Sequence, residues 1–308
     1  IAAAVYYLPW IMKHVMAWIH QYPMVKKLPG PKGLPIVGSL ADLAGDTTEP
    51  LKFWLKEADK ARDRGDNMFT MVALGRVIHF PLDGQAVKCI AESTTELSKG
   101  KDYEYLRAWV GDGILLSIGQ QWRERRRVLT PMFHFSKLEG YIETFNKHAR
   151  IMMDVTREFE GQETDMVGIT KRCSLDIICD AVMGGDFGTQ LNPTHPYVDA
   201  VDVFTRYSQR YNTEPQMWIT AIWYLLYHRE YKHALDEINQ LTEDLVNKRL
   251  KAIRAGEVDL TEKRKPLIDI FFEQTLHDAK MTDKEMHYEV NAIIFGGNRM
   301  SFITITTI

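Results

Sequence analysis

The chain has 308 residues, of which 45% are hydrophobic and 26% are charged, and its formal net charge is −3. This is the composition of a globular protein, and it excludes disordered and collagen-like classes. The near-neutral balance argues against binding to nucleic acid through bulk charge, so we expect no nucleic-acid partner. Cys89, Cys173 and Cys179 are too few for a disulfide framework and indicate reduced thiols.

Residues 1–27 form the first distinct segment. Twelve mostly apolar residues without charge come first, and aromatic residues and the pair Lys26 and Lys27 follow. Twelve helical residues span about 18 Å, which is less than the roughly 30 Å of a bilayer core. Aromatic residues followed by lysines are typical of a membrane interface and a cytosolic stop. We therefore expect a truncated membrane anchor here, and the alternative is an amphipathic first helix of a soluble domain.

Residues 28–40, "LPGPKGLPIVGSL", are rich in proline and glycine. Proline fixes φ and glycine permits sharp reversals, so this segment cannot be helical. Its apolar residues Leu34, Ile36 and Val37 favour a packed, stiff hinge over a flexible linker.

The rest of the chain, residues 41–308, is predicted to be mainly α with a small β element near its start. We expect a helix over 49–64, a β-hairpin over 68–81, where β-branched and apolar residues flank Gly75, and a helix over 83–93. Apolar spacings of three and four predict the later helices, which are near 137–159, 167–183, 196–210, 215–227, 230–255, 266–279 and 283–308.

The stretch "GQQWRERRRVL" carries four arginines on a predicted helix. Trp122 and Arg126 are four residues apart and share one face, with Arg125 as the other near neighbour of the tryptophan. Arg123 and Arg127 form a second pair, rotated by about 100°. An indole N–H beside a guanidinium suits a carboxylate or a phosphate. The alternative is a solvated basic helix with the tryptophan in the core.

The segment "WRERRRVLTPMFHF" resembles helix C of cytochrome P450 enzymes, in particular those of family 4, the fatty-acid ω-hydroxylase-like group. "KLPGPKGLPIVGSL" is similar to the proline-rich hinge of that family, "SLDIICDAVMG" to its helix E, and "EVNAIIFGGNRMS" to its central helix I. The resemblance runs in order from about residue 27 to about 301. It implies a cytochrome P450 fold that is incomplete at the C-terminus and ends within helix I.

The resemblance also implies site residues. Trp122 and Arg126 would donate hydrogen bonds to a heme propionate. Arg123 and Arg127 would lie on the surface that docks the NADPH–cytochrome P450 reductase, which supplies the electrons.

Four further positions follow from the same resemblance. Leu115 and Leu116 would lie in the loop over the heme, and Gly296 and Gly297 would be where helix I passes closest to the porphyrin. No metal ligand can be named, because none of the three cysteines stands in the family's axial-ligand motif, and we expect that cysteine to lie outside this chain.

The last part of the chain departs from the family pattern. Arg299 and Met300 stand where the family has its proton-delivering acid and threonine, and Ser301 is at the second alcohol position. The closing β-branched run is a poor continuation for a helix. We therefore expect a transcript or gene-model artefact, or a degenerate gene, near 296–308. We also expect the 308-residue chain alone to be inactive and to lack the reduced carbon-monoxide spectrum.

The function predicted on this basis is a heme-thiolate monooxygenase, on the cytosolic face of the endoplasmic reticulum membrane. It would insert one oxygen atom of O2 into an apolar substrate, such as a fatty acid or another lipid. The alternative is a non-catalytic remnant, or a regulatory helical protein, that lacks the heme ligand.

Overall fold

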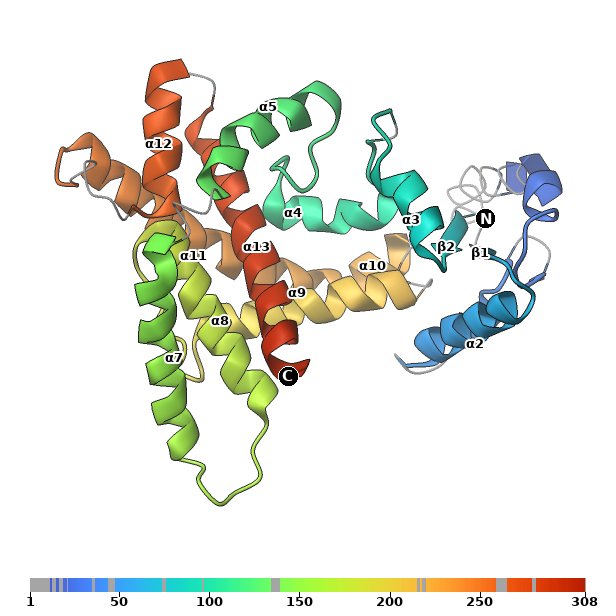
Figure 1. Ribbon diagram of the computed structural model, residues 1–308, viewed down its shortest axis with the longest axis horizontal. Coiled ribbons are helices and arrows are strands. Elements are labelled where there is room, and N and C mark those ends of the chain that lie inside the picture. The colour runs from blue at the N-terminus through green and yellow to red at the C-terminus, as the bar shows by residue number, and fades with distance from the viewer. Residues whose placement is uncertain are drawn as a thin grey trace. The chain divides into compact units, whose positions relative to one another are not determined.

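The computed structural model describes the backbone of most of the chain (Figure 1). The chain divides into two compact units. The first unit comprises Ile1–Leu97 and Tyr207–His228, and the second comprises Ser98–Arg206 and Arg229–Ile308. The described residues are 12, 15–16, 19–20, 22–34, 37–43, 48–73, 76–95, 97–133, 139–214, 217, 220–258, 265–278 and 281–307.

The first unit is built around a β-hairpin. Strands β1 and β2 pair antiparallel, and Phe69 stacks on its register partner Phe80 with ring centroids 4.5 Å apart. Helix α2 buries Ala58 and Ala61 against this layer. The predicted hairpin and both predicted helices are confirmed. The elements are η1 (Ala41–Leu43), α2 (Glu49–Asp63), β1 (Met68–Ala73), β2 (Arg76–Pro81), α3 (Gly84–Ala91) and α10 (Thr220–Leu226).

The hinge, residues 28–40, lies along β1. The backbone N–H of Thr70 donates to Pro29 O at 2.7 Å, and that of Ser39 donates to Val72 O at 2.7 Å. Gly38 has φ +63°, and a Cβ there would lie 2.0 Å from Val72 O, so only glycine fits. The expectation that Leu34 is packed was wrong, because its side chain is 59% exposed. The segment is held by backbone hydrogen bonds rather than by that side chain.

The second unit is helical. Helix α9 begins in this unit and ends in the first one. The helices predicted from residue 137 onward are confirmed over their described parts, including α10 of the first unit, with boundaries that differ by a few residues. Residues 137–138, 215–216, 218–219 and 279 of these predictions lie outside the described residues. The elements are η2 (Lys101–Leu106), α4 (Arg107–Val110), α5 (Gly119–Leu129), η3 (Thr130–Phe133), η4 (Glu139–Tyr141), α7 (Ile142–Arg157), α8 (Met166–Met183), α9 (Pro196–Thr213), α11 (His228–Arg254), α12 (Leu267–Asp278) and α13 (Asp283–Thr307).

Helix α13 is the centre of the second unit and packs most extensively against α8 (Figure 1). It begins with a capping box, in which Thr282 N donates to Glu285 Oε2 at 2.7 Å and Glu285 N donates to Thr282 Oγ1 at 3.3 Å. It buries Met286 and Val290. The helix continues to Thr307 despite the β-branched run, so the expectation of a poor helical continuation was wrong for the backbone.

An aromatic cluster joins α4 to α13 within the second unit. Trp109 meets Phe204 and Phe295 edge to face, with ring centroids 4.9 and 5.3 Å apart. The Asn291 side chain donates from Nδ2 to Trp109 O at 3.1 Å. The start of the loop that precedes α5 is therefore held against the central helix.

Within the described residues, the structure contains no helix that is long and apolar enough to cross a membrane. Most of residues 1–21 lie outside the described residues, so the predicted anchor over 1–27 stays a prediction.

Candidate functional site

Helix α5 carries four arginines, and only one of them is buried. The side chain of Arg125 lies within the fold with 5% of its surface exposed, whereas Arg123, Arg126 and Arg127 are exposed. Because a buried guanidinium keeps its charge, it requires an acidic partner inside the protein.

Arg125 finds that partner on α13. Its Nη2 donates to Glu285 Oε1 at 2.7 Å, and its Nε lies 3.3 Å from Glu289 Oε1. The other carboxylate oxygen of Glu289 accepts the backbone N–H of Ile114 at 2.9 Å. One ion-pair cluster, Arg125–Glu285–Glu289, therefore attaches both α5 and the preceding loop to α13. In Figure 1, α5 and the loop before it lie beside the upper part of α13.

The two glutamates of this cluster have opposite pKa shifts. Burial raises the pKa of Glu289 to about 7, although the Ile114 N–H and Arg125 act in the other direction. Burial also acts to raise the pKa of Glu285, but hydrogen bonds from Thr282 and the charge of Arg125 outweigh it and leave that pKa below its usual value. Glu289 is thus the costlier carboxylate to keep charged.

This cluster was not predicted from the sequence. Helical spacing showed that Arg125 is a near neighbour of Trp122, but it could not show which arginine faces the protein interior. The usable signal was the pair Glu285 and Glu289, four residues apart on a helix that is otherwise apolar on that side.

Trp122 and Arg126 remain available for a ligand. Trp122 is half-buried and Arg126 is exposed. Over the described ranges, neither the indole N–H nor the guanidinium has a hydrogen-bond or ion-pair partner within the protein. Their four-residue spacing on α5 places them on one face, as predicted from the sequence. Together they present two kinds of N–H donor and one positive charge, which suits an external carboxylate.

The loop between α4 and α5, residues 111–118, lies close to α13. Gly111 has φ +53°, and a Cβ there would lie 2.1 Å from a ring carbon of Tyr288. In this loop Leu116 is buried and Leu115 is partly buried. The two leucines therefore form part of an apolar loop whose distance from α13 is fixed by glycine.

The two glycines of α13 have different surroundings. A Cβ on Gly297 would lie 2.7 Å from Ile178, so this glycine permits α13 to approach α8 closely. A Cβ on Gly296 would meet nothing within 4 Å in the described structure. Gly296 thus borders open space, whereas Gly297 has a packing role. The side chains of Arg299, Met300 and Ser301 lie outside the described residues.

The cysteines are free thiols. Cys89 is exposed on α3, and Cys173 and Cys179 are buried in α8. Burial raises the pKa of Cys173 to about 11 and that of Cys179 well above its usual value. Both α8 thiols therefore stay protonated at neutral pH.

A polar cluster elsewhere in the second unit joins α7 to α8. His148 Nε2 lies 3.1 Å from Asp180 Oδ2 and 3.6 Å from Asp186 Oδ2, and Gln190 Nε2 lies 3.2 Å from His148 Nδ1. The nitrogen of His148 and the carboxylate oxygens of Asp180 and Asp186 lie close enough together to hold a cation. The Lys147 ammonium lies 3.0 and 2.8 Å from the same two carboxylate oxygens, so the protein supplies the cation itself. We interpret the cluster as structural.

Comparison with known proteins identifies the fold and the family. The family model described as "Cytochrome P450" matches residues 28–308. The chain belongs to the cytochrome P450 family. The "Probable cytochrome P450 4d20" of Drosophila melanogaster is 29% identical over 294 residues, covering 88% of this chain and 56% of that protein. "Cytochrome P450 4V2" of Rattus norvegicus is 30% identical over 225 residues, covering 69% and 43%.

A solved structure agrees. The crystal structure of the cytochrome P450DA heme domain has a TM-score of 0.67 and 22% identity, and the match covers 88% of this chain and 56% of that one. The chain thus spans about half the length of the proteins it matches. The predicted resemblance to a family 4-like cytochrome P450 and the predicted incomplete P450 fold are confirmed.

Proposed function

We propose that this chain forms part of a heme-dependent monooxygenase, in which Trp122 and Arg126 bind a propionate of the heme. The observation that carries this proposal is the division of the α5 arginines. Arg125 is engaged by two glutamates inside the protein, whereas the Trp122–Arg126 face has no partner within the described residues. A positive face without a partner, on a helix held rigidly by a buried ion pair, suits a cofactor carboxylate.

The residues present fit one side of a heme. Trp122 Nε1 and the Arg126 guanidinium supply donors for a carboxylate, and Gly296 leaves open space beside α13. None of Cys89, Cys173 and Cys179 is proposed as the iron ligand. When bound, a heme supplies the iron chemistry by which one oxygen atom of O2 is inserted into a substrate.

The residues of the proposed heme site then have separate roles. Trp122 and Arg126 hold and orient the propionate. Leu115 and Leu116 cover the site with apolar side chains and limit access of water, while Gly296 admits the close approach of a flat ring. Gly297, predicted as a second point of close approach, instead lies against α8.

The partners and the substrate class are proposed from the family. Arg123 and Arg127 are exposed and form the docking surface for the NADPH–cytochrome P450 reductase. The substrate is a fatty acid or another lipid, which is supported by the resemblance to family 4. Residues 1–27 attach the protein to the endoplasmic reticulum membrane, with the remainder of the chain on the cytosolic face.

Hemin titration of the full-length protein, with its axial-ligand loop intact, tests the assignment of Trp122 and Arg126. Arg126→Ala should weaken heme retention by about 1–3 kcal/mol, because it removes a charge-assisted hydrogen bond. Heme content after gel filtration, read from the Soret absorbance, measures the effect. The matched control is Arg123→Ala, which removes the same charge from the other face of α5 and should leave heme content unchanged. Equal loss of heme in both variants would contradict the assignment.

A non-catalytic P450 remnant is the second candidate. It is favoured by Arg299 and Met300, which stand where the family has its acid and threonine. These side chains cannot deliver protons as an acid–alcohol pair does. Sequencing of the full-length transcript distinguishes the two: a downstream loop with the axial cysteine would favour the monooxygenase, and a transcript without that loop would favour the remnant.

A further inference from the structure

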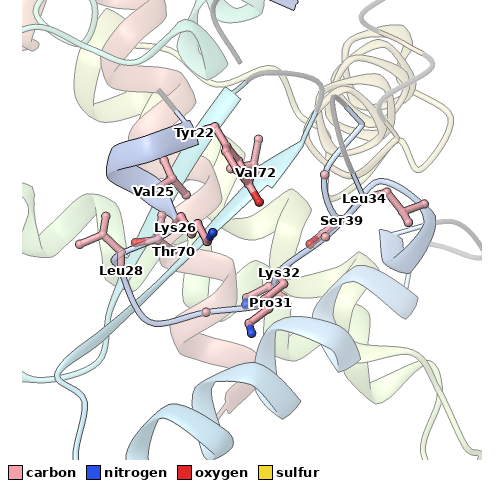
Figure 2. Close-up of a pocket in the computed structure, with 13 residues that line it drawn as sticks. Tyr22, Val25, Lys26, Leu28, Pro31, Lys32, Leu34, Ser39, Thr70 and Val72 are labelled. Atoms are coloured by element: carbon pink, nitrogen blue, oxygen red, sulfur yellow. The ribbon is translucent and has the colours of Figure 1, made fainter. Parts of the chain in front are cut away.

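A pocket of about 190 Å³ lies between the hinge and β1 in the first unit (Figure 2). Its walls combine apolar side chains, including Leu28 and Leu34, with the polar side chains of Lys26, Lys32 and Ser39. The backbone hydrogen bonds between the hinge and β1 fix its floor. The site is therefore built by the proline-rich segment that the proposed monooxygenase chemistry does not use.

The pocket is electrostatically one-sided. Lys26 and Lys32 line it, and none of the described residues that line it is acidic. Among the described residues, neither ammonium group has an ion-pair partner. Two positive charges beside a cavity without a counter-charge favour an anion there.

Ser39 supplies a second and independent indication of a ligand. Its side chain is only 1% exposed, and its hydroxyl has no hydrogen-bond partner in the described structure. A buried hydroxyl without a partner is unfavourable, so an acceptor oxygen inside the pocket would stabilise it. Its backbone N–H is already bonded to Val72 O, so the hydroxyl is held in place.

The surroundings of the pocket indicate where the anion comes from. Leu34 on its rim and the nearby Met24 are each 59% exposed. Upstream, Met12, Met16 and Ile19 are all more than half exposed, and spacings of four and three place them on one side of a helix. An apolar strip beside a basic pocket matches a lipid surface, in which acyl chains lie next to phosphate groups.

We propose that the pocket binds the phosphate of an anionic phospholipid, with Lys26, Lys32 and Ser39 as its donors and the exposed apolar residues against the acyl region. The site rests on the proposed membrane attachment but adds a headgroup preference to it. Membrane attachment alone predicts binding to neutral vesicles, whereas the pocket predicts an additional affinity for anionic vesicles. The two proposals can therefore be refuted separately.

The test compares flotation of the protein with vesicles of phosphatidylcholine alone and with added phosphatidic acid. Lys26→Ala and Lys32→Ala should each lower the affinity for anionic vesicles by roughly fivefold. Ser39→Ala removes a hydrogen bond without changing the charge, and it should also lower that affinity severalfold. The matched control is Lys27→Ala, because Lys27 is exposed and adjacent but does not line the pocket.

Three results would overturn the assignment. An equal loss for Lys27→Ala and Lys32→Ala, with no effect of Ser39→Ala, would show a diffuse basic surface instead of a pocket. Absence of any preference for phosphatidic acid in the wild type would exclude a headgroup site. Binding of glycerol phosphate as tightly as vesicles would show a site for a soluble phosphate. Circular dichroism of each variant confirms that the fold is retained.

Discussion

Substitution of Arg125 by alanine should destabilise the protein strongly, and the loss should depend on pH. The change removes the cation but leaves Glu289 fully buried, and among the described residues its carboxylate keeps only the Ile114 N–H as a partner. Removal of one member of a buried ion pair costs about 3–5 kcal/mol, since the remaining charge is uncompensated. That is a large share of the roughly 5–15 kcal/mol by which domains are stable.

The pH dependence follows from the pKa of Glu289. Burial raises the pKa of Glu289 to about 7 in the folded protein, whereas an unburied glutamate has a pKa of 4.5. The folded state therefore binds the proton more tightly, and the stability contributed by the protonated carboxyl falls as pH rises from about 4.5 to about 7. At 1.36 kcal/mol per pKa unit, this amounts to about 3 kcal/mol. Because Arg125 lowers the pKa of Glu289, its removal extends the fall to higher pH.

Urea denaturation followed by circular dichroism measures both effects. The free energy of unfolding lost by Arg125→Ala should be about 3–5 kcal/mol near pH 8 and clearly smaller near pH 5, where Glu289 is protonated in either protein. The control is Arg123→Ala, which alters an exposed side chain and should change stability by less than about 0.5 kcal/mol. In a Glu289→Gln background, the loss should shrink. A loss independent of pH, or equal for Arg123→Ala, would refute the argument.

Three other outcomes are expected. Arg127→Ala should slow electron transfer from the reductase severalfold at low salt, with the difference disappearing at high salt in stopped-flow measurements. Gly111→Ala should cost more than about 2 kcal/mol in thermal unfolding, because the new Cβ meets an α13 tyrosine ring; Gly161→Ala, which also has positive φ but open space, should cost less. Asp180→Asn should cost about 1–2 kcal/mol at neutral pH, because Lys147 loses a partner. Burial acts to raise the pKa of Asp180, but hydrogen bonds from Lys147 and His148 outweigh it and lower that pKa. The stability that Asp180 contributes should therefore be lost as pH falls below about 4.

Local features of the fold could be predicted from the sequence. The hairpin, the capping box of Thr282 and Glu285 and the later helices depend on short-range rules of periodicity and capping. The orientation of α5 could not be predicted in this way. Its buried face is set by Glu285, which is 160 residues from Arg125 in the chain, and helical spacing contains no information about so distant a partner.

The exposure of Leu34 shows a second limit. Among prolines and glycines an apolar side chain suggested packing, yet the hinge is held by main-chain hydrogen bonds to β1, which composition does not reveal. His148 gives the opposite case. A single histidine in the sequence carries no signal for burial, yet His148 on α7 is buried and contacts Asp180 of α8. Neighbouring Lys147 supplies the positive charge for Asp180 and Asp186.

The buried ion pair links stability to the candidate site. Arg125 fixes α5 on α13, and Glu289 binds the backbone of Ile114, the residue immediately before Leu115 and Leu116. The same carboxylate therefore sets the position of the helix that presents Arg126 and of the loop predicted to cover the heme. Arg125, which lies outside the proposed propionate site, would thus govern the position of Arg126 within that site. Heme retention should consequently fall in Arg125→Ala as well, but together with stability, whereas Arg126→Ala should lower heme retention alone.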